Sequence, residues 1–241
     1  MNIIKIESTS STNSYLKEFA SRQMLEEGTV LQAYEQTAGR GQAGTSWEAE
    51  PGKNITCSII FYPLFLPLKQ NFLLSKVIAL GVKETLDNYS ENVSIKWPND
   101  IYIRDRKVAG ILIENELSGQ QISQSVVGIG VNINQEIFFS NAPNPVSVKQ
   151  LTGIDIDTGI FLEEMIVKIM FWYDYLKQGH SSIISENYLK SLYHKSGFHL
   201  YQDQKGLFMA EIQDIKDNGL LFLITDKGEE RSFFFKEIAF I

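Results

Sequence analysis

A glycine-rich loop between two strand-like segments constrains the fold of this chain more than any other sequence feature. Gly39, Gly41 and Gly44 have the GxGxxG spacing of dinucleotide-binding loops. That fingerprint requires a helix directly after the loop, so that the helix N-terminus meets the pyrophosphate. Here the loop continues into 47–52, which is poor helix sequence, and a second strand-like run follows at 54–62. The spacing therefore fails as a Rossmann signature, and the chain also lacks the GxxxxGK[ST] motif of P-loop enzymes.

The loop itself has two interpretations. As a ligand site, its glycines let the backbone approach an anion closely, and Arg40 supplies a guanidinium that matches phosphate or carboxylate oxygens. Trp47 then offers a flat apolar surface on which an adenine can stack. As plain structure, the same residues make a glycine hairpin with a solvated arginine and a core tryptophan. The loop alone leaves both interpretations open.

Hydrophobic periodicity predicts an α+β chain. Apolar residues at helical spacing predict helices at 10–25, 70–89, 161–176 and 183–193. Strand-like runs occupy 29–35, 54–62, 93–97, 107–117 and 121–133. After Gly197 the pattern changes to short β-like runs with Asp-Asn-Gly and Asp-Lys-Gly turns between them, at 207–215, 220–224 and 231–238. We therefore expect a mixed central β-sheet with flanking helices at 1–194, and a small antiparallel barrel at 195–241 packed on it.

Charge and composition exclude several classes of protein. A net charge of -7 and an isoelectric point near 5.1 argue against broad DNA or RNA binding, which needs a basic face. The single cysteine, Cys57, excludes an intramolecular disulfide and fits a reducing compartment. The N-terminus has no signal-peptide pattern, and the longest apolar run, 59–68, is broken by two prolines and too short to span a bilayer. We therefore expect a cytoplasmic protein that does not bind DNA or a membrane.

The segment Lys96-Trp97-Pro98-Asn99-Asp100 concentrates polar groups at the end of an expected strand. Asp100 is a candidate to hold Mg²⁺ or to orient a cation, and Asn99 is a candidate to hydrogen-bond a substrate. Pro-Asn-Asp is also the sequence of an ordinary turn. The segment alone does not decide between a site and a turn.

Two strand-like runs carry glycines that would admit a ligand close to the backbone. Lys107 stands at the mouth of an apolar run and is followed by Gly110, which makes a candidate anion site, although a hairpin with edge charges has the same composition. Gly128 and Gly130 lie inside a strand, where glycine costs stability, so a close approach to the backbone is expected there. Asn132 would then read a polar edge of a base.

Taken in order, these motifs resemble the biotin protein ligase family. Ser11-Thr12-Asn13, GRGxxG with a following tryptophan, KWPND, RKVAGILIE and GIGVNIN follow one another over roughly the first 135 residues. The pair KWPND and KxxGIL is highly specific to this family. The resemblance implies a class II synthetase-like catalytic domain, and it implies that the C-terminal barrel is SH3-like.

The resemblance also implies an activity. Family members activate biotin with ATP to biotinoyl-5'-AMP, with Mg²⁺, and transfer biotin to a lysine of a biotin carboxyl carrier domain of a biotin-dependent carboxylase. Some members form homodimers through the central sheet. The bifunctional relatives carry a helix-turn-helix domain before the Ser-Thr-Asn segment, which begins here at Ser11, so we expect a monofunctional ligase without a DNA-binding role.

Individual roles follow from the resemblance residue by residue. Lys107 and Arg40 are the expected catalytic residues. The expected biotin contacts are Ser11, Thr12, Asn13, Gln36, Gly39, Arg40, Gly41, Gln42, Lys107 and Gly110. The expected contacts to ATP or the adenylate are Arg40, Trp47, Lys96, Asn99, Asp100, Lys107, Gly130 and Asn132, with Asp100 as the metal ligand.

One position departs from the family pattern, and two alternatives remain. Many members carry a second arginine where this chain has Gln42, so we expect weaker retention of the adenylate. Lipoate or octanoate ligases share the fold, but their RRxxGGGxVxHD-type motif has no counterpart in the loop here. A non-catalytic binder would be expected to have lost Arg40 or Lys107, and both are present.

Overall fold

Seven strands form a mixed central sheet in the computed structural model, which describes residues 2–140 and 144–241. Their spatial order is β1-β2-β3-β7-β6-β5-β4. β1 pairs with β2 in parallel, and every other neighbouring pair is antiparallel. The strands are β1 (Ile3–Thr9), β2 (Val30–Gln36), β3 (Ile55–Phe61), β4 (Val93–Lys96), β5 (Asp100–Ile103), β6 (Arg106–Ser118) and β7 (Gln121–Val131).

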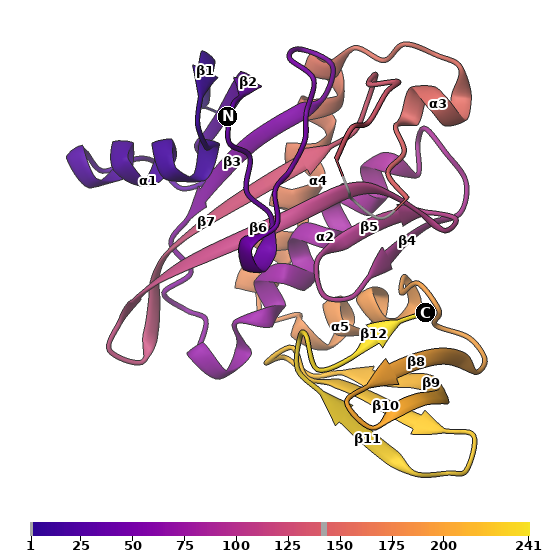
Figure 1. Cartoon of the computed structure of the whole chain (residues 1–241). Helices are drawn as coiled ribbons and strands as arrows, with labels where there is room; N and C mark the ends of the chain where they lie inside the picture. The colour runs from indigo at the N-terminus through magenta and orange to yellow at the C-terminus, as the bar shows by residue number, and fades with distance from the viewer. Residues whose placement is uncertain (1, 141–143) are drawn as a thin grey trace.

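Helices cover both faces of this sheet (Figure 1). Side chains alternate between the faces of a strand, so Ile60 and Val126 pack into a small cluster under α1, while Ile59 and Val127 point into the large core with α2 and α4. The helices are α1 (Thr12–Arg22), α2 (Phe72–Leu86), α3 (Val148–Thr152), α4 (Thr158–Lys177) and α5 (Ser181–Lys190), with 3-10 turns η1 (Gln42–Gly44) and η2 (Leu68–Gln70).

A second, five-stranded antiparallel sheet contains the C-terminal part of the chain. Its order is β11-β10-β9-β8-β12, and Figure 1 shows it below the central sheet, next to α5. The strands are β8 (His199–Asp203), β9 (Gly206–Ile215), β10 (Leu221–Thr225), β11 (Glu230–Phe233) and β12 (Ala239–Phe240). The change of pattern after Gly197 thus marks the second sheet. The division at 194/195 falls between α5 and β8 and stays a prediction of a domain boundary.

The sequence pattern located most elements and missed several, among them the seven-residue β1 and the two-residue β12. The α+β class and the central sheet with flanking helices are confirmed. β1, β5, β8 and β12 were not predicted, nor was α3. The strand expected at 231–238 is wrong beyond Phe233, because the chain turns there: the Glu237 N–H donates to the Phe234 carbonyl at 3.1 Å, and Lys236 has a φ of 74°.

Buried Lys76 of α2 holds the two sheets together. Its side chain is 1% exposed, and its ammonium donates to the Asp217 carboxylate at 2.9 Å, the Ile215 carbonyl at 2.9 Å and the Ser185 hydroxyl at 2.8 Å. Burial lowers the pKa of Lys76, and the adjacent Asp217 carboxylate opposes that shift. The turn between β9 and β10 is therefore fixed to α2 by charged hydrogen bonds.

Within the part of the chain that the structure describes, no helix combines the length and the apolar character needed to cross a membrane.

The buried Lys76 network predicts a large stability effect. Lys76→Ala removes the cation paired with Asp217, which keeps only the Ser185 hydroxyl as a side-chain donor, and removes the ammonium that donates to the Ile215 carbonyl, so we expect a loss of about 3 kcal/mol in the free energy of unfolding. Lys83→Ala, which removes a partly exposed ion pair with Asp87 on the same helix, is the matched control and is expected to cost less than about 1 kcal/mol. Urea unfolding of both variants checks this, and equal losses would contradict it.

Candidate active site

A cavity of about 880 Å³ lies on the α1 side of the central sheet, over β6 and β7. It is lined by all the site residues expected from the sequence except Gly39: Ser11, Thr12, Asn13, Gln36, Arg40, Gly41, Gln42, Trp47, Lys96, Asn99, Asp100, Lys107, Gly110, Gly130 and Asn132. Residues from six separate segments of the first 132 positions thus meet around one space.

Glycines form the floor of the cavity because an indole lies against them. Gly110 and Gly130 face each other across the β6–β7 ladder. A Cβ atom on Gly130 would lie 2.3 Å from Cε2 of Trp47, and one on Gly110 would lie 3.0 Å from Cζ3 of the same ring. The close approach expected at the strand glycines is therefore made, in this structure, by the tryptophan of the glycine-rich loop.

Asn13 contacts the third glycine of the cavity floor, Gly128. A Cβ atom on Gly128 would lie 2.6 Å from the Asn13 side-chain oxygen. That oxygen accepts from the Ser58 hydroxyl at 2.6 Å, while the amide nitrogen donates to Glu114 at 2.8 Å and to the Leu112 carbonyl at 3.3 Å. These contacts fix the Asn13 amide so that its oxygen is the group left to accept another hydrogen bond.

The start of α1 is tied to the end of β2 at the same end of the cavity. Ser11 is the N-cap residue of α1, which explains why Ser and Thr stand before the helix. The Thr12 N–H and hydroxyl both donate to the Gln36 side-chain oxygen, at 2.9 and 3.2 Å. Ser11, Thr12 and Asn13 are 5%, 4% and 2% exposed, so this end of the site is a buried polar surface.

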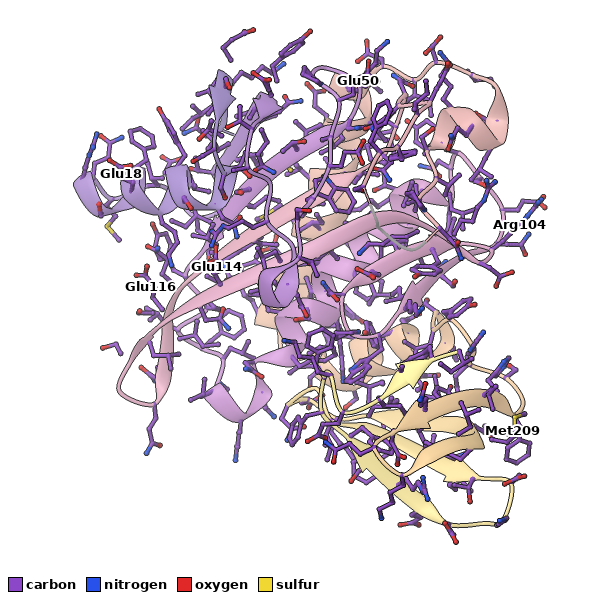
Figure 2. All side chains as sticks on the ribbon, in the orientation of Figure 1. Glu18, Glu50, Arg104, Glu114, Glu116 and Met209 are labelled. Atoms are coloured by element: carbon purple, nitrogen blue, oxygen red, sulfur yellow. The ribbon has the colours of Figure 1, made fainter. Side chains whose placement is uncertain are left out.

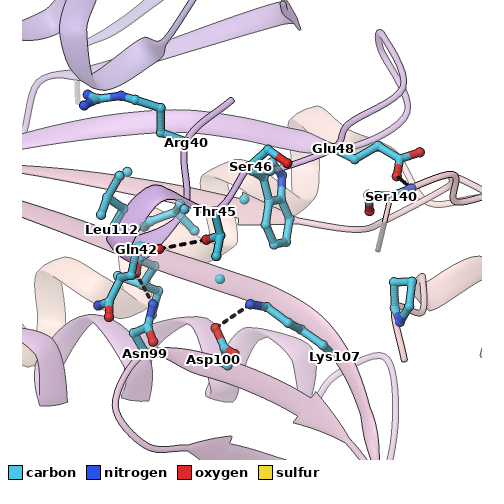
Figure 3. A pocket seen from close by; sticks show the side chains of 18 of the residues that line it. Arg40, Gln42, Thr45, Ser46, Glu48, Asn99, Asp100, Lys107, Leu112 and Ser140 are labelled. Carbon is cyan, nitrogen blue, oxygen red and sulfur yellow. Dashed lines mark hydrogen bonds and ion pairs between the residues drawn. The ribbon is translucent and has the colours of Figure 1, made fainter. Parts of the chain in front are cut away.

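The two cations expected to be catalytic point to different partners. The Lys107 ammonium lies 2.6 Å from the Asp100 carboxylate. Arg40 donates instead to Glu114 at 3.0 Å and to the Ser14 hydroxyl at 3.2 Å, and Figure 3 shows it extending away from the Lys107–Asp100 pair. Glu114 of β6 lies near α1 (Figure 2). Its carboxylate oxygen accepts from both Asn13 and Arg40.

Two asparagines complete the site beside these charges. Asn99 donates to the Ile111 carbonyl at 2.7 Å, which fixes the KWPND turn to β6. Asn132 donates to the Val146 carbonyl at 3.2 Å, while its side-chain oxygen is buried and has no hydrogen-bond partner among the described residues. A buried carbonyl oxygen without a donor is costly, so the oxygen of Asn132, a residue that lines the cavity, is a candidate acceptor for a donor group of a ligand.

Sequence reasoning missed Glu48, which anchors the loop at 137–140. Its carboxylate accepts from the backbone N–H groups of Phe139, at 2.9 and 3.0 Å, and of Ser140, at 2.6 Å, and from the Gln135 amide at 3.1 Å. Burial opposes ionisation of Glu48, yet these hydrogen bonds lower its pKa below the ordinary value. No spacing in the sequence links Glu48 to this loop, because the contact depends on the fold.

The C-terminal sheet also contributes to the lining, which the sequence did not indicate. Phe235, Ile238, Ala239 and Phe240 border the cavity. The indole N–H of Trp97, in the KWPND segment, donates to the Gly219 carbonyl of the second sheet at 3.1 Å. The run of three phenylalanines at 233–235 is a local signal in this part of the sequence, and Phe235 of that run borders the cavity.

The residues at the cavity fit a magnesium ion that is coordinated mainly by the phosphates of a bound substrate. Among the described residues, no group of three or more His, Cys, Asp or Glu side chains can hold a metal ion. The lining carboxylates are Asp100 and Glu48, and Glu48 is occupied by the loop. Burial raises the pKa of Cys57 to about 12, so it offers no thiolate. Mg²⁺ commonly takes one or two carboxylates together with substrate phosphates, and Asp100, which is paired with Lys107 here, is the lining carboxylate that would serve.

Comparisons with known proteins place this geometry in a family. Residues 5–132 match the model of the biotin/lipoate A/B protein ligase family. The bifunctional ligase/repressor BirA of Bacillus spizizenii is 30% identical over 91% of this chain and 68% of that protein. The biotin--[acetyl-CoA-carboxylase] ligase of Paracoccus denitrificans is 35% identical over 58% of this chain and 60% of that protein. The structure of the Aquifex aeolicus biotin protein ligase in complex with biotin and ATP aligns with a TM-score of 0.80 at 27% identity, over 99% of this chain and 97% of that one.

The glycine floor predicts a graded response to added methyl groups. Gly130→Ala places a Cβ atom too close to Trp47 for the ring to stay, whereas Gly110→Ala, at 3.0 Å from the same ring, needs only a small shift. We expect the indole N–H resonance of Trp47 in an NMR spectrum to move strongly in Gly130→Ala and slightly in Gly110→Ala. An unchanged resonance in Gly130→Ala would show that Trp47 does not lie on the floor in solution.

Proposed function

This chain belongs to the biotin/lipoate A/B protein ligase family, and from that premise we propose that it is an ATP-dependent biotin protein ligase. The observation that carries the proposal is the single cavity in which the start of α1, the glycine-rich loop and the KWPND and RKVAG segments meet. A relative named as a biotin ligase is 35% identical over 58% of this chain, and a structure solved with biotin and ATP shares this fold at 27% identity.

The reaction has two steps. An oxygen of the biotin carboxylate attacks the α-phosphorus of ATP, and pyrophosphate leaves, which gives the mixed anhydride biotinoyl-5'-AMP. The amine of a carrier lysine then attacks the biotinyl carbonyl, loses a proton, and AMP leaves. In the first step two anionic groups must approach each other, so the residues of the site must supply positive charge at the reacting oxygens.

The polar end of the cavity favours biotin over lipoate. The ureido group of biotin has two N–H donors and a carbonyl, whereas the dithiolane of lipoate has neither. Thr12, Asn13 and Ser58 are buried at this end, and the Asn13 oxygen is left to accept a hydrogen bond. These groups already have partners within the protein, but an apolar ring would offer no donor to the remaining lone pair of the Asn13 oxygen, whereas a ureido N–H would, and a missing hydrogen bond of this kind discriminates between substrates.

The other end of the cavity suits a nucleotide. Trp47 provides a ring on which adenine stacks, and the Asn132 oxygen is an acceptor for its amino group. Lys96, Asn99 and Asp100 would surround the phosphates. Asp100 would be the protein ligand of Mg²⁺, which supplies additional positive charge to the phosphates when it is bound.

Lys107 and Arg40 would stabilise the charge that develops during adenylation. Lys107, near the start of β6, lines the cavity and is paired with Asp100 of the KWPND segment. Arg40 would leave Glu114 and contact the incoming anion instead. This exchange of partners would move the glycine-rich loop over the site. A closed loop also excludes water from biotinoyl-5'-AMP, which would otherwise hydrolyse.

The acceptor, the assembly and the location are parts of the same proposal. A biotin carboxyl carrier domain of a carboxylase receives the biotinyl group. A second copy would pair through the central sheet, whose edges are β1 and β4. A cytoplasmic location follows from the need for ATP and a carrier protein. The acidic net charge argues against DNA binding.

The test is a reconstituted reaction of the full chain with ATP, Mg²⁺ and biotin, with and without a carrier domain. Biotin-dependent pyrophosphate release and a gain of one biotinyl group in the carrier mass are the expected results. Pyrophosphate release without carrier modification would keep the adenylation step and overturn the acceptor. Activity with lipoate and not with biotin would assign the chain to the lipoate branch of the family.

Removal of Lys107 tests the adenylation step. Lys107→Ala is expected to lower kcat/KM for biotin-dependent pyrophosphate release by about 10²–10³, because a preorganised cation at the reacting oxygens is lost. Lys216→Ala, which removes an exposed ammonium that is paired with Asp214 and does not line the cavity, should leave the rate unchanged. Steady-state kinetics compare the two, and equal rates in both variants would exclude a direct role for Lys107.

Gln42 tests how the loop retains the intermediate. Gln42 lines the cavity at the start of η1, where its carbonyl accepts from the Thr45 hydroxyl at 2.8 Å (Figure 3). Gln42→Arg adds a guanidinium beside the adenylate and is expected to slow biotinoyl-5'-AMP dissociation by about 3- to 10-fold. Stopped-flow displacement measures this rate. An unchanged rate would mean that Gln42 does not limit retention.

A further inference from the structure

Lys96 lies in a cage of three aromatic rings, one from each sheet and one from the segment between α5 and β8. Its ammonium is 4.7 Å from the ring centroid of Tyr102 in β5, 5.6 Å from that of Tyr193 after α5, and 5.6 Å from that of Phe240 in β12. All three distances are within the range of cation–π attraction. Phe240 is the one ring of the cage that belongs to the C-terminal sheet.

The aromatic cage surrounds the Lys96 ammonium without supplying a negative charge to pair with it. Among the described residues, Lys96 has no carboxylate within 4.0 Å, and its ammonium makes one side-chain hydrogen bond, to the Tyr102 hydroxyl at 3.3 Å. Burial lowers the pKa of Lys96, the neighbouring Asp100 opposes that shift, and Lys107 adds to it. Lys107 and Arg40, by contrast, are each paired with a carboxylate.

Phe240 is itself held firmly in the second sheet. It pairs with Tyr201 in the β8–β12 ladder and packs edge-on against that ring at a centroid distance of 5.0 Å. It also lies 6.2 Å from the ring of His194, which stacks between Tyr193 and His199. Both Phe240 and Lys96 line the cavity. The position of the C-terminal strand therefore sets one wall of the Lys96 cage.

We propose that Phe240 is a positioning residue for the nucleotide. It keeps the Lys96 ammonium at the cavity wall, free of any carboxylate, so that the cation is available to the triphosphate of ATP. Without an aromatic face at position 240, the ammonium would turn toward Asp100 and lose its availability. This inference rests on the proposed nucleotide role of the cavity and adds to it a residue from the C-terminal sheet.

The test separates the aromatic face of Phe240 from its bulk. Phe240→Leu keeps an apolar side chain but removes the ring, and Phe240→Tyr keeps the ring. Phe234→Leu, at a half-exposed phenylalanine just after β11 that does not line the cavity, is the matched control. We expect Phe240→Leu to raise the KM for ATP by about 3- to 10-fold with the KM for biotin unchanged. Phe240→Tyr and Phe234→Leu should behave as the wild type.

A double variant gives a second readout. If Phe240 acts through Lys96, Phe240→Leu adds nothing to the KM for ATP in a Lys96→Met background. Thermal melting checks that each variant is folded. If Phe240→Leu unfolds, Phe240→Met, whose flexible side chain fills the same space, replaces it.

Several results would overturn the inference. In Phe240→Leu, these results are an unchanged KM for ATP or equal rises in the KM values for ATP and biotin. In Phe240→Tyr, the result is a KM for ATP as high as that of Phe240→Leu. In the double variant, it is a KM for ATP raised by the sum of the two single effects. The activity of the wild-type protein separates a failure of this inference from a failure of the proposed function, because these variants are compared with a wild type that releases pyrophosphate when biotin is present. A wild-type protein without biotin-dependent pyrophosphate release would refute the proposed function itself.

Discussion

The candidate site depends on the missing side chains of three glycines on the central strands. Gly110, Gly128 and Gly130 lie on the α1 side of β6 and β7, and a Cβ atom on Gly128 or Gly130 would collide with Asn13 or Trp47. Ordinary side chains would fill this face and would push both residues away from the sheet. The price of three glycines in strand interiors is lost strand stability, and the long β6–β7 pairing and the core behind it compensate for that loss.

The cavity gathers positive charge within an acidic chain. Arg40, Lys96 and Lys107 line a space where, among the residues that the structure describes, Asp100 and Glu48 are the bordering carboxylates, while the chain as a whole carries a net charge of -7. Each cation is held by a different partner: a carboxylate of β6, a cage of aromatic rings, and the carboxylate of the KWPND turn. An arrangement of this kind can accept a carboxylate and a triphosphate together, because each cation can exchange or share its partner as the anions enter.

The sequence predicted what local patterns encode and missed what depends on the fold. Long runs with helical periodicity predicted α2 and α4. The glycines of β7 predicted that another group approaches the strand backbone closely. The pattern could not tell that Trp47 makes that approach, that Glu48 anchors the loop at 137–140, or that Phe240 closes the wall beside Lys96. Those contacts join residues far apart in the chain, and no spacing encodes them. The two-residue strand β12 is too short for any periodicity to show.

The most direct measurement offers the protein biotin and lipoate together. Equal concentrations of both acids are incubated with ATP and Mg²⁺ in the absence of any carrier, and the acyl-adenylates released on denaturation are identified by mass spectrometry. The buried polar surface around Thr12, Asn13 and Ser58 predicts biotinoyl-AMP as the dominant product. Lipoyl-AMP as the dominant product would contradict the assignment of this surface to a ureido ring, and the absence of any acyl-adenylate would contradict the adenylation chemistry itself.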